Sequence, residues 1–137
     1  MSNFTAKELE YMQSQRWGRL ATISPDGRPQ IAPVGFRYNI ELDTIDIGGF
    51  NMSQSKKFRN ILTNPNVSFV IDNVLPPWQP RGVEIRGTAQ AIDQGGKALF
   101  EADYNADNAL IRVSALQIIG WCLDTDAYKP LNRKVNA

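Results

Sequence analysis

Residues 50–57, with the sequence FNMSQSKK, contain the side chains best suited to bind an anion. The pattern predicts a helix that begins here, where unpaired backbone amides and the positive end of the helix dipole would lie beside two hydroxyl and two ammonium groups. A charge-assisted hydrogen bond contributes roughly 1.5–3 kcal/mol, so two of them plus the helix end would anchor a phosphate ester. The alternative interpretation is that Ser53 caps the helix and that Lys56 and Lys57 are solvated surface charges.

The absence of histidine limits which catalytic and metal sites the chain can form. The chain of 137 residues has no histidine and one cysteine, Cys122. Ser-His-Asp triads, Cys-His dyads, HExxH zinc sites and thiolate clusters are therefore excluded, and no disulfide can form within the chain. Chemistry must rest on carboxylates, lysines, hydroxyls or a cofactor. We expect no metal site and assign no catalytic residue.

Composition indicates an ordinary globular protein. The chain is 42% hydrophobic and 21% charged, with a formal net charge of +1, so neither a nucleic-acid nor a membrane-surface role is favoured. The first residues lack the basic and apolar regions of a signal peptide, and no apolar run is long enough for a membrane span. We expect one cytoplasmic domain over residues 1–137.

The first half of the chain alternates between strand and helix signals. A capping box at Thr5 and Glu8 predicts a helix over about residues 6–15. Alternating apolar residues and turn signals then predict strands and one further helix. The expected strands are 19–23, 29–38, 44–49 and 67–71, and the expected helix is 53–62.

The second half predicts more strands. Residues 73–80 are proline-rich and are expected to form a surface loop. A long strand over 83–92 contains Gly87, which suggests a bulge or a barrel corner. A short helix near 97–104, two closing strands over 110–113 and 118–123, and a loose tail from about residue 129 complete the prediction. About six or seven short strands with helices between them favour a mainly β, Greek-key barrel.

Three ordered stretches give the chain a resemblance to a known family. They are residues 18–29 (GRLATISPDGRP), Ser55 to Lys57 followed by Asn64-Pro65, and residues 81–89 (RGVEIRGTA). Together they resemble the pyridoxamine 5′-phosphate oxidase-like superfamily over about residues 8–124. The similarity is greatest to its deazaflavin-dependent branch, whose members bind coenzyme F420 and have a stretch like residues 78–82 (WQPRG).

The resemblance implies a split β-barrel homodimer with two cofactors at the subunit interface. By position it assigns the cofactor phosphate to one element and the ring to two others. The phosphate element is Ser55, Lys56 and Lys57. The residues placed near the ring and its ribityl chain are Gln30, Pro33, Val34, Asn51, Met52 and Ser53. Trp78 and Arg81 match a loop that family dimers place near the neighbouring subunit's cofactor.

Two departures from the family pattern bear on the cofactor and the substrate. Flavin-dependent oxidases of the family have an arginine in the second strand that grips the FMN phosphate, whereas residues 31–36 are IAPVGF. The basic, proline-containing end of true pyridoxamine phosphate oxidases is also missing. The resemblance therefore implies a reductase that uses coenzyme F420 to pass hydride to a small organic acceptor. The alternatives are an FMN-dependent oxidase or reductase and a non-catalytic binder of flavin or deazaflavin.

Overall fold

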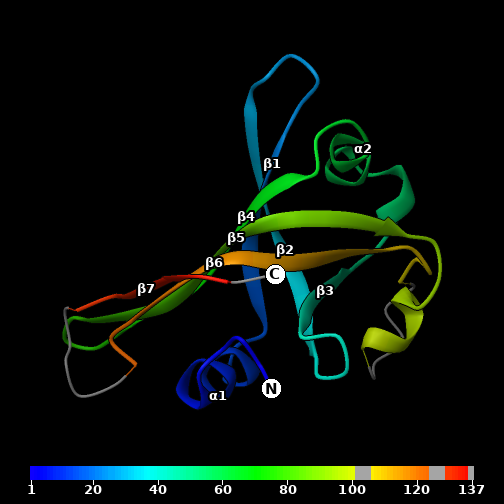
Figure 1. Ribbon diagram of the computed structural model, residues 1–137. Coiled ribbons are helices and arrows are strands. Elements are labelled where there is room, and N and C mark those ends of the chain that lie inside the picture. Colours follow the sequence, from blue (N-terminus) through cyan, green and yellow to red (C-terminus); the bar gives the residue numbers. More distant parts are fainter. Residues whose placement is uncertain (101–105, 124–128, 136–137) are drawn as a thin grey trace.

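The computed structural model, which describes residues 1–100, 106–123 and 129–135, contains a closed barrel of six antiparallel strands (Figure 1). The strands follow the order β3-β2-β1-β4-β5-β6, and pairing of β3 with β6 closes the ring. A seventh strand pairs with β6 outside the ring. The strands are β1 (Trp17–Ile23), β2 (Pro29–Asn39), β3 (Thr44–Gly48), β4 (Asn66–Leu75), β5 (Gln79–Ile92), β6 (Leu110–Trp121) and β7 (Leu131–Lys134). The predicted mainly β barrel is confirmed.

Two α-helices and two short 3-10 helices complete the described structure. They are α1 (Ala6–Ser14), η1 (Met52–Gln54), α2 (Lys56–Thr63) and η2 (Gly96–Leu99). The predicted capping box is present, because the Glu8 amide donates to Thr5 Oγ1 at 3.1 Å and the Thr5 amide donates to Glu8 Oε1 at 2.8 Å. In the described part of the chain no helix is long and apolar enough to cross a membrane.

The barrel interior is filled by large apolar side chains, at least one from each of the six strands. Alternation along the strands turns every second residue inward, so these side chains meet at the centre. Phe36 and Phe69 meet edge to face with ring centroids 5.4 Å apart. Examples from β1 to β6 are Leu20, Phe36, Ile47, Phe69, Ile85 and Ile111.

The predicted bulge at Gly87 is confirmed. The pairing of β5 with β6 shifts register between Arg86 and Gly87. A Cβ atom at Gly87 would collide with the carbonyl oxygen of Ser114, so only glycine lets the two strands approach here. Arg86 pairs with Gln117 and Gly87 with Ala115, so the extra residue is Leu116 of β6. The bulge therefore bends β6 beside Gly87 and helps the sheet close.

The region predicted as a loop over 73–80 is instead the end of a β-hairpin. Strand β4 continues to Leu75 and β5 begins at Gln79, so only residues 76–78 form the turn. The loop prediction was wrong because two of the prolines occupy the turn itself, where no ladder amide is needed, and Pro80 lies next to it on the strand. The hairpin extends away from the barrel (Figure 1).

Two predictions near the C-terminus also need correction. The two expected closing strands are one continuous strand, β6. The residues expected to form a loose tail include β7, whose Arg133 forms an ion pair with the buried Glu8. As a mostly exposed edge strand, β7 lacks the apolar alternation on which the prediction depended. Of the helix expected near 97–104, η2 covers 96–99, and residues 101–105 lie outside the described part.

Candidate functional site

A small pocket lies at the N-terminus of α2, where it meets β1 and β2. Its volume is about 170 Å³, and it brings together three of the predicted site residues, Gln30, Lys56 and Lys57. The buried Asn60 of α2 fixes the helix here: its amide nitrogen donates to Gln30 Oε1 at 2.8 Å and to Thr22 Oγ1 at 3.0 Å. Sequence analysis missed Asn60, because nothing in the local pattern distinguishes it from a surface residue.

The lysines of this pocket form no salt bridge in the described structure. Neither Lys56 nor Lys57 forms a salt bridge with any described residue. Lys57 is half-buried, and burial lowers the pKa of its ammonium group. A partly desolvated cation without a counter-charge is stabilised when an anion binds. A phosphate ester therefore fits the donor set of this pocket.

The two serines of the predicted phosphate element have structural partners. Ser55 is the N-cap of α2: its hydroxyl accepts from the Phe58 amide at 3.3 Å and donates to the Met52 carbonyl at 2.6 Å. The interpretation that Ser53 caps the helix was therefore wrong. The Ser53 amide and hydroxyl donate to Asp107 Oδ2 at 2.8 and 2.6 Å. These hydrogen bonds, with that from the Ser53 hydroxyl foremost, lower the pKa of Asp107 to about 2.

The residues predicted near the ring divide between core and surface. The side chains of Val34 and Met52 are buried in the core, so only their main-chain atoms could face a ligand. Pro33 is exposed on β2, opposite Arg19 of β1. Asn51 is exposed in a left-handed conformation, with φ of 56°, immediately before η1. Pro33, Asn51 and Gln30, which is exposed and lines the lysine pocket, are therefore the accessible members of this group.

Trp78 and Arg81 lie at the other end of β4 from α2. Trp78 is 67% exposed in the hairpin turn. Arg81 lies over the Tyr11 ring, 4.9 Å from its centroid, and donates to Asn73 Oδ1 at 3.0 Å. Tyr11 donates to the same oxygen at 2.7 Å, and burial raises its pKa to about 12. Since the 10 residues of β4 span about 30 Å, one chain does not bring this hairpin to the lysine pocket.

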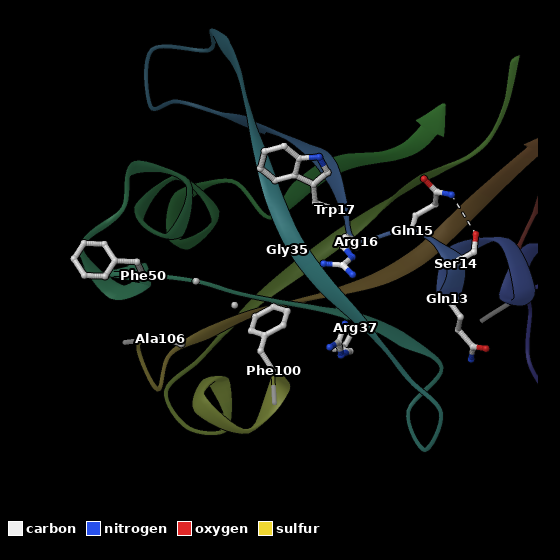
Figure 2. A pocket seen from close by; sticks show the side chains of 12 residues that line it. Gln13, Ser14, Gln15, Arg16, Trp17, Gly35, Arg37, Phe50, Phe100 and Ala106 are labelled. Carbon is white, nitrogen blue, oxygen red and sulfur yellow. Dashed lines mark hydrogen bonds between the residues drawn. The ribbon is translucent and has the colours of Figure 1, made fainter. Parts of the chain in front are cut away.

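A much larger cavity, of about 1130 Å³, opens between the end of α1, strands β2 and β3, and the segments after β3 and η2. Sequence analysis did not predict it. Figure 2 shows Phe50 apart from the other labelled side chains, Arg37 next to the Phe100 ring, and the guanidinium group of Arg16 nearer Gly35. It is lined by Gln13, Ser14, Gln15, Arg16, Trp17, Gly35, Arg37, Gly48, Gly49, Phe50, Phe100 and Ala106.

Glycines shape one wall of this cavity. Gly35 of β2 pairs with both Trp17 of β1 and Gly48 of β3. Cβ atoms at Gly35 and Gly48 would lie 3.1 and 3.2 Å from the Phe100 ring, so the absence of side chains lets this ring pack against the strands. Two glycines facing each other on neighbouring strands were the available sequence signal, because such pairs mark close approach by another group.

Comparisons with known proteins agree with this architecture. The family model described as pyridoxamine 5′-phosphate oxidase matches residues 4–122. A 5a,11a-dehydrotetracycline/5a,11a-dehydrooxytetracycline reductase of Streptomyces rimosus is 40% identical over 125 residues, which are 90% of this chain and 86% of the relative.

Solved structures share the fold at lower identity. A conserved hypothetical protein of Mycobacterium tuberculosis has a TM-score of 0.69 at 22% identity, with 88% of this chain and 84% of that chain covered. A FAD binding protein of Mycobacterium smegmatis has a TM-score of 0.65 at 21% identity, with 85% and 95% covered. Because the family model and the reductase each match most of the chain, this protein belongs to the pyridoxamine 5′-phosphate oxidase family and is an oxidoreductase.

Proposed function

We propose that the chain is a cytoplasmic, coenzyme F420-dependent reductase that passes hydride to a small organic acceptor. The observation that carries this proposal is the lysine pocket, where Lys57 is half-buried beside Lys56 and neither forms a salt bridge with a described residue. In this proposal both lysines and the amides that begin α2 hold the cofactor's phosphate. Pro33 and Asn51 would meet the ring.

The choice of deazaflavin over FMN rests on the second strand. Residues 31–36 include no cation. Gln30, the residue before them, lines the pocket but is also neutral. The phosphate would therefore depend on α2 alone for its positive charge. An FMN-dependent reductase is the second candidate, and the fold similarity to a FAD binding protein of Mycobacterium smegmatis favours it.

The acceptor is proposed to contain an activated double bond. The Streptomyces rimosus relative is named for reducing 5a,11a-dehydrotetracycline and its oxytetracycline counterpart, and a reduced deazaflavin supplies hydride for such a bond. The residues of this chain would fix the acceptor in the large cavity and exclude water from it. With no histidine in the chain, the proton that completes the reduction would come from solvent or a hydroxyl such as Ser14, which lines the cavity.

Titration of the purified protein with coenzyme F420 and with FMN tests the proposal. We expect tighter binding of coenzyme F420 by calorimetry, followed by turnover when the reduced deazaflavin and an activated alkene are supplied. Equal or tighter FMN binding would overturn the preference for deazaflavin. Binding without any turnover over a panel of activated alkenes would favour a non-catalytic binder.

We also propose that the protein acts as a homodimer. Strand β4, about 30 Å long, separates the hairpin turn with the exposed Trp78 from the α2 end of the same chain. We infer that a cofactor in the lysine pocket would meet the hairpin of a second copy. Val74, Leu75 and Trp78 give this hairpin an apolar, exposed surface suited to such a contact. Sedimentation at micromolar concentration should show a dimer, and a monomer under these conditions would refute the proposal.

A further inference from the structure

The described lining of the large cavity carries positive charge and no negative charge. Its two ionisable lining residues are Arg16 and Arg37, and none of the described residues that line it is acidic. Neither arginine forms a salt bridge within the described part of the chain, whereas five other arginines do. Figure 2 shows the guanidinium group of Arg16 near Gly35 and that of Arg37 near Phe100, both among the residues that line the cavity.

The nearest acidic neighbour of Arg37 in the sheet is already neutralised. Asp46 is the cross-strand partner of Arg37 on β3. Its Oδ1 accepts from Arg112 Nε at 2.9 Å and its Oδ2 from Arg112 Nη2 at 3.0 Å, in a two-bonded ion pair on the side away from the cavity's Arg37. Asn39 and Thr44 donate to the remaining lone pairs. The charge of Arg37 is therefore left for another partner.

The same cavity has aromatic walls that suit a flat molecule. Trp17 and Phe50 are large side chains that remain mostly exposed, and Phe100 packs against the paired glycines of β2 and β3. The Arg37 guanidinium lies over the Phe100 ring, 5.2 Å from its centroid, which holds the cation beside an aromatic surface. Flat rings stack on aromatic faces, and guanidinium groups bind planar oxyanions in two-bonded geometry.

We propose that Arg16 and Arg37 form a site for the acceptor, and that it selects flat, conjugated molecules with a delocalised negative charge, as a ring-bound carboxylate or enolate. This inference rests on the proposed function, because it names the class of acceptor for the same cavity. The aromatic side chains would hold the ring, and the two guanidinium groups would hold the oxyanion. A neutral molecule of the same shape would leave both guanidinium groups without a partner.

Calorimetry with a matched pair of probes tests this site without any cofactor. The probes are 1-hydroxy-2-naphthoate, which is anionic, and 1-hydroxy-2-naphthamide, which has the same ring system but no charge. We expect the parent protein to prefer the naphthoate by ten-fold or more. Arg16→Gln and Arg37→Gln should each weaken naphthoate binding by about ten-fold, the low end for a charge-assisted contact because both side chains are exposed, and should leave naphthamide binding unchanged.

Three control variants make the result specific. Arg59→Gln removes an exposed arginine of α2 that lines none of the cavities described above, and should bind both probes like the parent. Arg37→Lys should retain most of the preference for the anion, because it keeps the charge. Lys57→Met removes the proposed phosphate contact and should also leave naphthoate binding unchanged.

Three results with the probes would overturn the inference. Equal affinity for the two probes, or parent-like naphthoate binding by both Arg→Gln variants, would show that the arginines do not select charge. Loss of naphthoate binding in Lys57→Met would place the probe in the lysine pocket instead. Failure of the protein to bind either redox cofactor would refute the proposed function but would leave this measurement interpretable.

Discussion

Glu8 and Arg133, 125 positions apart in the sequence, form an ion pair in which Arg133 Nη1 donates to Glu8 Oε2 at 2.9 Å. Glu8 is only 2% exposed and also completes the capping box of α1. One carboxylate therefore holds the first helix to the last strand, and Gly120 of β6 provides the space, since a Cβ atom there would collide with Glu8.

Arg133→Met should destabilise the protein by about 3 kcal/mol, because removing one partner leaves a buried carboxylate uncompensated. Chemical denaturation would measure the loss. Lys134→Met, on the same strand but exposed, is the matched control and should change the free energy of unfolding by less than about 0.5 kcal/mol. Similar small effects of both substitutions would mean that β7 adds little to stability.

Lys57→Met should weaken cofactor binding more than it weakens folding. The methionine retains the apolar stem of the half-buried side chain while the charge is lost, so we expect about a ten- to hundred-fold increase in the dissociation constant of coenzyme F420. The measurement is calorimetry at low salt, where screening is least. Lys7→Met, on the exposed face of α1, should bind like the parent. Parent-like affinity of Lys57→Met would return Lys57 to the role of a surface charge.

Gly87→Ala should disrupt the barrel, whereas Gly49→Ala should be tolerated. A Cβ atom at position 87 meets the main chain of β6, and overpacking of this kind costs about 1–3 kcal/mol or more. At position 49 the closest atom to a new Cβ would be Met52 Cε at 4.0 Å, an ordinary contact. Thermal unfolding of the two variants would compare them directly. A large loss at position 49 with none at 87 would contradict the role given to the bulge.

Asp107 should titrate far below an ordinary aspartate, and Ser53 should be the main reason. Its pKa is lowered to about 2 from 3.8, so its contribution to stability is present above pH 3.8 and is lost as the pH falls toward 2. Ser53→Ala removes the largest cause and should raise the pKa of Asp107 toward 3.8. Carboxyl chemical shifts followed by NMR would report the midpoint. An unchanged midpoint in Ser53→Ala would assign the shift to the backbone donors instead.

Local signals predicted much of the fold, and non-local contacts account for what was missed. The capping box at Thr5, the alternation of β1 to β3 and the bulge at Gly87 depend on near neighbours or on glycine geometry, so sequence alone identified them. Strand β7 forms because it pairs with the edge of β6 and because Arg133 forms an ion pair with Glu8. The sequence of residues 131–134 alone indicates neither interaction.

In the candidate site, too, the part built from a short stretch of sequence was predicted and the part built from distant segments was not. The lysine pocket is centred on the first turn of one helix, so its lysines could be found from a short stretch. The large cavity combines α1, β2, the segment after β3 and Phe100, which are distant in the sequence. Arg16 and Arg37 each resemble an ordinary surface cation until the fold shows them beside the same cavity without an acidic partner among the described residues.

The closure of the barrel has a consequence for synthesis of the chain. The pairing of β3 with β6, reinforced by Asp46 and Arg112, joins residues 66 positions apart. During translation, β1 to β5 leave the ribosome before β6 can complete the ring. One edge of β3 therefore stays unpaired until β6 has been synthesised. Contacts between residues so far apart in the sequence slow folding. The unpaired edge of β3 is the place where a nascent chain of this protein would most readily mispair with another copy.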